Sequence, residues 1–314
     1  MSLAFIFPGQ GSQAVGMGDE LGQAFAAARA VFQEVDEALG QNLSRLIRDG
    51  PIEELTLTEN AQPALMAVSL AVIRCLAADF DIAIESAAFV AGHSLGEYSA
   101  LAAADSIALA DAARLLKLRG KAMQRAAPLG AGAMASLIGP KSDVALAEAA
   151  ARAGSEFGVC VVANDNNAGN VVISGARIAV DRAIEEAKVL GARAIPLNVS
   201  APFHCPLMAP AAGVMREALA SIQIRPPGAP LVANITARPT HDPATIRSLL
   251  VDQVTGRVRW RESVEWLAGE GGVNRFVEAG AGKALTGMVK RTAPDAEALV
   301  LNVPADLEAF AKLL

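Results

Sequence analysis

Residues 88–104 read AFVAGHSLGEYSALAAA, and the architecture of the chain follows from them. A short apolar run, typical of a buried strand, leads into Gly92-His93-Ser94-Leu95-Gly96, a G-x-S-x-G motif, and then into an alanine-rich run typical of a helix. The two glycines permit a tight strand-to-helix turn that presents the Ser94 hydroxyl at the end of the strand. The Leu95 amide is expected to face the same space and to stabilise an oxyanion. The alternative is an ordinary glycine-rich turn with an N-capping serine, but the flanking strand and helix favour a nucleophile.

A serine nucleophile needs a base, and the chain has three histidines. His93 adjoins Ser94, so we expect its side chain to point elsewhere and to pack beside the turn. His241 lies in a proline-bounded polar loop and is expected to be solvated. His204 follows a predicted strand, in a segment that two prolines keep out of a helix, so it can reach a serine at the end of another strand. His204 is therefore the predicted base, and the side chain of its neighbour Cys205 is expected to diverge from it.

No acidic residue stands out as the group that orients the histidine. In the usual α/β-hydrolase an acid lies between the serine and the histidine in sequence. A backbone carbonyl can orient an imidazole instead. The residues alone therefore do not identify the group that orients the histidine.

Arg119 lies in the predicted helix DAARLLKLRGKAMQRAA, residues 111–127. The other basic residues of this helix share one polar stripe, whereas Arg119 falls on the apolar face with Leu116 and Met123. A guanidinium on an apolar face is costly unless it meets an anion, and its fork best matches a carboxylate. The anion is either an internal Asp or Glu or a ligand, and a ligand role indicates a substrate with a free carboxylate near the reacting carbonyl.

A third motif, FPGQGSQ at residues 7–13, directly follows an apolar run. Its glycines formally satisfy a dinucleotide-binding fingerprint. Glycines interrupt the helix that follows, and no acid stands at a strand end about 20 residues later, so the pattern argues against a nucleotide-binding dehydrogenase. The motif is then either a loop whose Gln10 contributes to an oxyanion site or a plain turn.

The composition indicates a globular protein: of 314 residues, 53% are hydrophobic and 19% charged. The net charge of −6 comes without blocks of like charge, which argues against a nucleic-acid partner. The widely spaced Cys75, Cys160 and Cys205 exclude a disulfide framework and the usual zinc spacings, and they fit a reducing compartment. The N-terminus reads as a strand rather than a signal peptide, and apolar stretches such as 64–73 are shorter than the ~18 residues that span a bilayer. We therefore expect a cytoplasmic protein with no membrane partner and no metal.

Strand-like runs alternate with helical ones, which indicates an α/β fold with a mainly parallel sheet. The expected strands are 3–7, 87–91, 159–163, 171–174, 194–199, 231–234 and 275–278. From a glycine-rich crossing at 128–139, the order becomes β-α-β-β-α-β, with a strand at 134–138 and helices at 141–153 and 178–190, as in a ferredoxin-like unit. We expect a core formed by 1–127 and 199–314 and an inserted ferredoxin-like subdomain at 128–198.

Together these segments resemble the malonyl-CoA:acyl carrier protein transacylase family of acyltransferases. FPGQGSQ, TENAQPAL, GHSLGEYSA, the Arg119 helix, VVISG, FHCPLM and VRWRESV occur in the family's order over nearly the whole chain. The resemblance implies an α/β-hydrolase-like core with a ferredoxin-like insert, in agreement with the division above. It also implies an enzyme of fatty acid biosynthesis whose partners are malonyl-CoA and holo acyl carrier protein. We expect no cofactor and a monomer.

The resemblance also implies roles for residues of the site. Ser94 is then the nucleophile and His204 its base, and the amides of Gln10 and Leu95 form the oxyanion hole.

Recognition of the substrate follows from further matches. Arg119 binds the malonyl carboxylate, and the main-chain carbonyl of Gln253, in LLVDQV, orients the histidine in place of the missing acid. Gln62 and Asn166 match polar positions near the family's pocket, although either can instead satisfy local backbone.

Three departures from the family pattern stand beside these matches. Ala168 and Asn170 occupy positions where the family often has Pro and Gln, and Arg257 replaces a common proline. Phe203 before the histidine and Leu95 after the nucleophile resemble malonyl-selective members, whereas methylmalonyl-selective relatives often carry Ser before the histidine.

The implied reaction is a two-step transfer through a malonyl-serine. A serine thioesterase or esterase with the same elbow releases the acyl group to water instead of to a thiol. Two further hypotheses are a polyketide-type acyltransferase and a dehydrogenase that uses the glycine-rich loop.

Overall fold

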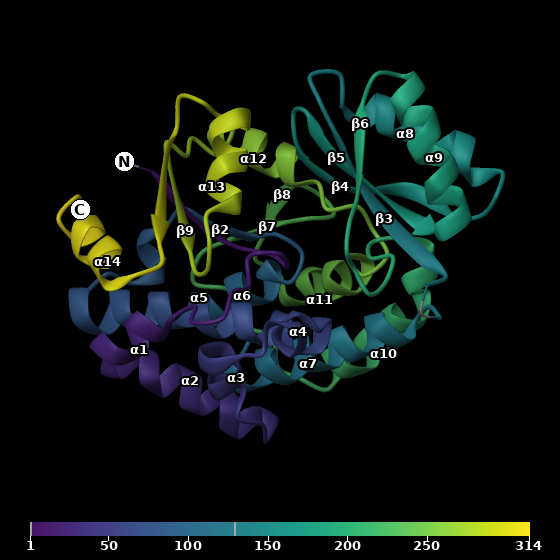
Figure 1. Cartoon of the computed structure of the whole chain (residues 1–314). Coiled ribbons are helices and arrows are strands. Elements are labelled where there is room, and N and C mark those ends of the chain that lie inside the picture. The colour runs from purple at the N-terminus through teal and green to yellow at the C-terminus, as the bar shows by residue number, and fades with distance from the viewer. Residues whose placement is uncertain (1, 129) are drawn as a thin grey trace.

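The structure, a computed structural model, describes residues 2–128 and 130–314 and contains two sheets (Figure 1). The larger sheet has the order β10-β9-β1-β2-β7-β8. Its strands are β1 Leu3–Phe7, β2 Phe89–Gly92, β7 Leu231–Ala233, β8 Arg238–Thr240, β9 Arg275–Ala279 and β10 Glu297–Leu301. Neighbouring strands are parallel, apart from the antiparallel edge pair β7 and β8. The predicted α/β class with a mainly parallel sheet is confirmed.

The central strand β1 is apolar at every position because both of its faces are covered. Successive side chains of a strand point to opposite faces. Phe5 and Phe7 therefore enter the larger core, whereas Ala4 and Ile6 enter a second core that includes Trp260. A continuous apolar run, rather than an alternating one, is what such a doubly covered parallel strand requires.

Helices cover both faces of the larger sheet (Figure 1). Those that contribute to the larger core are α1 Asp19–Ala24, α2 Ala26–Leu39, α3 Leu43–Asp49, α4 Ile52–Thr56, α5 Thr58–Phe80, α6 Gly96–Ala103, α7 Leu109–Arg125, α10 Ala209–Ala220, α11 Pro243–Asp252 and α14 Pro304–Ala311. The second core is closed by α12 Trp260–Ala268 and α13 Ala284–Thr292.

Helix α5 is longer than the apolar stretch at 64–73 that marks it in the sequence. Its length, and a mean hydropathy of 1.7 over an 18-residue window, would suffice to cross a membrane. However, 72% of the residues in this window are buried inside the molecule. Packing against α2 and α7 in the larger core accounts for its apolar composition.

The smaller sheet has the order β4-β5-β3-β6 and is antiparallel throughout. It consists of β3 Gly132–Ile138, β4 Cys160–Asn167, β5 Asn170–Ala176 and β6 Arg193–Pro196, packed against α8 Val144–Ser155 and α9 Arg177–Val189 around a separate apolar core (Figure 1). The ferredoxin-like order expected for this segment is confirmed, while the division at residues 128 and 198 stays a proposal.

The differences from the predicted elements have local causes. Strands β8 and β10 were not predicted, and β8 has only three residues. The strand expected at 194–199 ends at Pro196, where β6 leaves the sheet. The helix expected from residue 141 begins at Val144, because the Asp143 side chain accepts a hydrogen bond from the Leu146 amide and caps the helix there.

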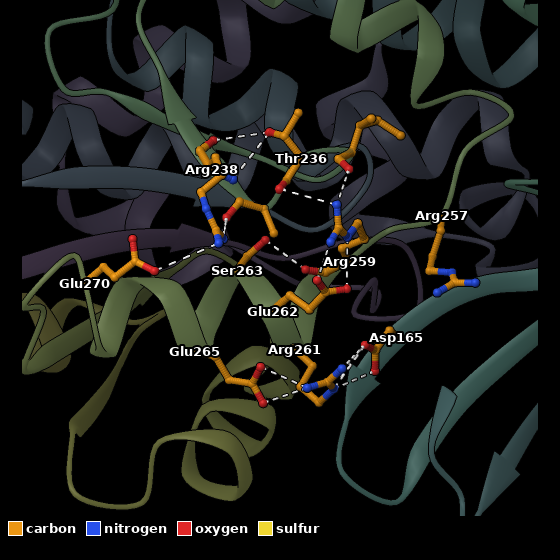
Figure 2. Close-up of polar contacts among 12 residues, drawn as sticks. Asp165, Thr236, Arg238, Arg257, Arg259, Arg261, Glu262, Ser263, Glu265 and Glu270 are labelled. Atoms are coloured by element: carbon orange, nitrogen blue, oxygen red, sulfur yellow. Dashed lines mark hydrogen bonds and ion pairs between the residues drawn. The ribbon is translucent and has the colours of Figure 1, made fainter. Parts of the chain in front are cut away.

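Strand β4 is fastened to the core by α12, whose Arg261 contacts Asp165 (Figure 2), and by the segment before this helix. The Asp165 amide donates to the Val258 carbonyl at 2.9 Å, and the Val258 amide donates to Ala163 at 2.8 Å. Arg261 of α12 also pairs with the buried Asp165 carboxylate, with Nη2 and Oδ2 2.8 Å apart. These contacts hold one edge of the smaller sheet in place beside the end of β2.

Candidate active site

The turn between β2 and α6 places Ser94 in the left-handed region, with φ of 54°. A non-glycine residue there costs about 1–3 kcal/mol, so neighbouring contacts must impose it. A Cβ on Gly92 would lie 1.9 Å from backbone atoms of Gly96, and one on Gly96 would lie 2.3 Å from the Phe7 carbonyl oxygen. Only glycine fits either position, so the motif glycines create the sharp turn that exposes the Ser94 hydroxyl.

Ser94 and His204, which lie 110 residues apart, are brought together: Ser94 Oγ lies 2.8 Å from His204 Nε2. The other ring nitrogen, Nδ1, donates a hydrogen bond to the main-chain carbonyl of Gln253 at 2.9 Å. With its proton on Nδ1, the imidazole presents a lone pair at Nε2 to the serine hydroxyl. The arrangement is that of a nucleophile and a base with a carbonyl as the orienting group.

The imidazole of His204 is strongly biased toward its neutral form. Burial and the nearby positive charge of Arg119 lower its pKa to about 3, against the opposing effect of the Gln253 carbonyl. A neutral imidazole is the form that can accept a proton.

Arg119 is 1% exposed and reaches the same serine from α7. Its Nη2 donates to Ser94 Oγ at 3.1 Å and to Gln253 Oε1 at 2.8 Å, and its Nη1 donates to Gln62 Oε1 at 2.9 Å. All three acceptors are neutral, and among residues 2–128 and 130–314 no carboxylate forms an ion pair with this guanidinium. A buried positive charge without a partner anion therefore faces Ser94.

The amides of Gln10 and Leu95 are available to a ligand. Both residues line the cavity at Ser94, and neither amide donates a hydrogen bond within the described part of the chain. The Gln10 side chain is held separately by Thr58, with Nε2 and Oγ1 3.3 Å apart. Two free amides beside a serine hydroxyl can receive a developing oxyanion.

The cavity has a volume of about 290 Å³ and opens between the two sheets. The elements around the larger sheet contribute Gln10, Gln62, His93, Ser94, Leu95 and Arg119 to its lining. The smaller sheet contributes Met134 and Asn164. The segment after β6 completes the wall with residues 197–199, Phe203 and His204. A separate cavity of about 390 Å³ near α1, α2 and α3 contains none of the predicted site residues.

Asn166 lies behind the cavity wall rather than on it. Its Oδ1 accepts a hydrogen bond from His93 Nε2 at 2.9 Å, and the His93 ring also approaches Trp260. Asn164, two residues earlier on β4, is the asparagine that lines the cavity. His93 thus packs beside the elbow as the sequence predicts, and His241 is exposed.

Glu97 and Asn234 belong to this site although no sequence motif singled them out. Glu97, 1% exposed, accepts hydrogen bonds from the Asn234 amide at 2.6 Å and from Gln253 Nε2. Burial raises the pKa of Glu97 to about 8, although these hydrogen bonds and the Arg119 charge lower it. The sequence does place Glu97 close to Ser94, because Glu97 follows it by three residues and lies in the first turn of α6.

No group of three His, Cys, Asp or Glu side chains suited to a metal ion occurs in the described residues.

Residues 4–305 match the acyl transferase domain family. The malonyl CoA-acyl carrier protein transacylase of Bacillus subtilis (strain 168) is 43% identical over 307 residues, which cover 98% of this chain and 95% of that protein.

Solved structures are equally similar. A crystal structure of an acyl-carrier-protein-S-malonyltransferase from Bartonella henselae is 51% identical and has a TM-score of 0.97, covering 100% of this chain and 99% of that one. A malonyl-transacylase, PlMCAT, in complex with AntF, a holo type II PKS acyl carrier protein, is 40% identical with a TM-score of 0.96 and covers both chains completely, 100% and 100%.

Proposed function

The chain belongs to the acyl transferase domain family, and on this premise we propose that Ser94 carries a malonyl group from malonyl-CoA to acyl carrier protein. The chain is an acyl-carrier-protein S-malonyltransferase, in agreement with the resemblance seen in its motifs. The roles of the individual residues, argued below, are part of the proposal.

One observation supports the proposal above the others: a single oxygen, Ser94 Oγ, has a base on one side and a buried cation on the other. His204 Nε2 lies at 2.8 Å and Arg119 Nη2 at 3.1 Å. Because the Arg119 guanidinium lies so close to the attacking oxygen, it can pair with an anionic group of the substrate only if a short linker joins that group to the reacting carbonyl. The malonyl group, in which one methylene separates the two, meets this requirement.

In the first step, Ser94 Oγ attacks the thioester carbonyl carbon while His204 Nε2 takes the hydroxyl proton. The carbonyl oxygen becomes an oxyanion between the amides of Gln10 and Leu95. The intermediate collapses, the carbon–sulfur bond breaks, and coenzyme A leaves with the proton from His204. A malonyl ester of Ser94 remains, its carboxylate paired with Arg119.

In the second step, the phosphopantetheine thiol of holo acyl carrier protein enters the same cavity. His204 takes the thiol proton, the sulfur attacks the malonyl ester, and the oxyanion again rests on the two amides. Breaking of the ester bond returns the proton to Ser94 Oγ and frees the malonyl thioester. The same base and oxyanion site thus serve both steps.

The setting of the reaction is also part of the proposal. We place it in fatty acid biosynthesis, in the cytoplasm, with the enzyme acting as a monomer. Buried free cysteines at positions 75, 160 and 205 support a reducing compartment. A type II polyketide carrier is the alternative acceptor, because PlMCAT binds such a carrier.

The test is intact-mass spectrometry of acid-quenched protein after mixing with malonyl-CoA, beside Ser94→Ala. We expect a malonyl adduct in the wild type alone, and its discharge when holo acyl carrier protein is added. Matched fatty acid and polyketide carriers compared for discharge rate would identify the pathway.

Two outcomes would contradict the proposal. Accumulation of free malonate without carrier would indicate a thioesterase. An adduct that persists in Ser94→Ala would place the malonyl group on another residue.

A further inference from the structure

A buried carboxyl that the two steps above do not use joins groups on both sides of Ser94. Glu97 is 1% exposed, its Oε1 accepts the Asn234 amide at 2.6 Å, and its Oε2 accepts Gln253 Nε2. Burying a carboxyl is costly unless its hydrogen bonds compensate. The role of this carboxyl beside Ser94 therefore depends on the groups that its two partners, Asn234 and Gln253, bind.

Asn234 holds the backbone of the turn at Ser94, and Gln253 holds the side chains of His204 and Arg119. Asn234 Oδ1 accepts the Ser94 amide at 2.8 Å, and its Nδ2 donates to the Gly92 carbonyl at 2.7 Å. Gln253 receives His204 Nδ1 on its main-chain carbonyl at 2.9 Å and Arg119 Nη2 on its side-chain Oε1 at 2.8 Å.

The side-chain amide of Gln253 has two orientations, and its neighbours accept only one. With Oε1 toward Arg119, Nε2 donates to the Ser94 carbonyl at 2.9 Å and to Glu97. Reversed, the amide NH₂ would face the guanidinium N–H groups, and its oxygen would face two other oxygens.

Glu97 is the side chain that enforces this orientation. One of its donors is the backbone amide of Asn234, which cannot reverse, and the other is Gln253 Nε2. Above its pKa of about 8, Glu97 is a carboxylate that accepts from both donors. A carboxamide has one acceptor oxygen and would turn its NH₂ toward one of the donors. A glutamine at position 97 would therefore push the Gln253 amide toward the wrong orientation.

We propose that Glu97 is a positioning residue for malonyl recognition: it fixes the side-chain amide of Gln253 so that Gln253 Oε1 holds Arg119 toward Ser94. Glu97 itself touches no reacting atom. This inference rests on the proposed function, because it concerns the carboxylate of the malonyl group. Its consequence is a loss that falls more on malonyl than on acetyl transfer, since only malonyl engages Arg119.

The test compares Glu97→Gln with a matched control, Glu278→Gln. Glu278 is 0% exposed and likewise accepts two amides, those of Leu285 and Thr286, but it lies on β9 away from the cavity. In E97Q, assayed above pH 8, where wild-type Glu97 is ionised, we expect kcat/KM to fall by about 10- to 100-fold with malonyl-CoA, mostly through KM, and by clearly less with acetyl-CoA. E278Q should lower the melting temperature without changing the malonyl-to-acetyl ratio.

A double-mutant cycle shows whether Glu97 acts through Gln253. Gln253→Met removes the side-chain amide but keeps the carbonyl that orients His204. In the Q253M background, E97Q should cost little further malonyl selectivity, whereas independent, multiplying losses would overturn the proposal. If E97Q does not fold, Glu97→Asp serves, because it keeps the charge but is one methylene too short to reach both donors, and it should show a smaller loss with the same malonyl bias.

The proposal is overturned if the malonyl-to-acetyl ratio of E97Q, or of E97D in its place, equals that of the wild type. Failure of the proposed function gives a different result, because the wild type itself would then form no malonyl-serine adduct.

Discussion

In the proposed function, a single side chain, Arg119, distinguishes malonyl transfer from the transfer of a neutral acyl group. Its guanidinium is buried and bonded only to neutral acceptors, so an acetyl group leaves it without an anion. We expect Arg119→Ala to reduce kcat/KM for malonyl-CoA by about 10- to 100-fold relative to acetyl-CoA, the loss of about 1.5–3 kcal/mol from a charged hydrogen bond. Competing malonyl- and acetyl-CoA in one assay measures this ratio directly.

The matched control is Arg114→Ala, on the exposed stripe of the same helix, where the arginine pairs with Asp111. This variant should keep the wild-type ratio. Equal losses on both substrates in Arg119→Ala would remove its assigned role.

His204 gives a pH dependence whose sign follows from its lowered pKa. In the unfolded chain a histidine titrates near ~6.5, whereas burial and the Arg119 charge lower the pKa of His204 to about 3 in the folded protein. Between these values the unfolded state binds the proton and the folded state does not. The stability that His204 contributes is therefore fully present above about pH 6.5 and is lost as the pH falls toward about 3.

We accordingly expect the melting temperature of the wild type to fall more steeply between pH 7 and pH 5 than that of His204→Gln. His241→Gln, which changes an exposed histidine, should retain the wild-type slope. Parallel slopes for the wild type and His204→Gln would contradict a neutral, buried His204.

The residues predictable from the sequence are those whose signal is local. Ser94 and Leu95 stand in five consecutive residues whose glycines are required by contacts of 1.9 and 2.3 Å. Glu97 stands three residues after Ser94, but its bond to Asn234 joins residues 137 positions apart, so no local pattern predicts this contact. Only the parallel arrangement of β2 and β7, which ends both strands at the same edge, brings them together.

At the scale of elements, the ion pair between Asp165 and Arg261 helps to hold β4 in position. Arg261 pairs with Asp165 (Figure 2). The Asp165 side chain is 1% exposed and that of Arg261 is 29% exposed. Burial raises the pKa of Asp165 and Arg261 lowers it, so removal of the arginine leaves a carboxylate uncompensated. We expect Arg261→Ala to lose about 2 kcal/mol of unfolding free energy, below the ~3–5 kcal/mol of a fully buried pair because the arginine is partly exposed.

Because β4 carries Asn164 at the cavity wall, the KM for malonyl-CoA should rise in the same variant. Urea unfolding and initial-rate kinetics check the two effects. Glu265→Gln, which removes only the exposed second partner of Arg261, should cost below about 0.5 kcal/mol and leave KM unchanged. Similar losses in both variants would show that Asp165 does not position β4.

The departures from the family pattern have visible consequences at this scale. Arg257, in place of a common proline, pairs with Glu148 of α8 at 2.7 Å and adds a second link between the smaller unit and the core. Asn170 accepts a hydrogen bond from Ser136 Oγ at 2.9 Å within the smaller sheet. Such links join distant segments, so a sequence pattern predicts the strands but not how the two sheets are fastened.

Over the whole molecule, the cavity belongs to neither sheet alone. Ser94, Arg119 and His204 come from the elements around the larger sheet and from the segment after β6, whereas Met134 of β3 and Asn164 of β4 close the opposite wall. A malonyl group bound at Ser94 is therefore expected to contact residues of both sheets, and it should stabilise the smaller sheet as well as the larger one against local unfolding.

We expect hydrogen exchange in the malonyl-enzyme to slow by about tenfold, equivalent to ~1.4 kcal/mol, in β3, β4 and residues 197–203 as well as around Ser94. The physical reason is that opening the smaller sheet away from the core would expose the bound acyl group and break its pairing with Arg119. Exchange mass spectrometry of wild type with excess malonyl-CoA, beside Ser94→Ala, provides the measurement. Ser94→Ala should show weaker protection, because it cannot retain the acyl group. Protection restricted to 87–125, with β3 and β4 unchanged, would mean that the smaller sheet is only a scaffold and that recognition resides in the larger unit.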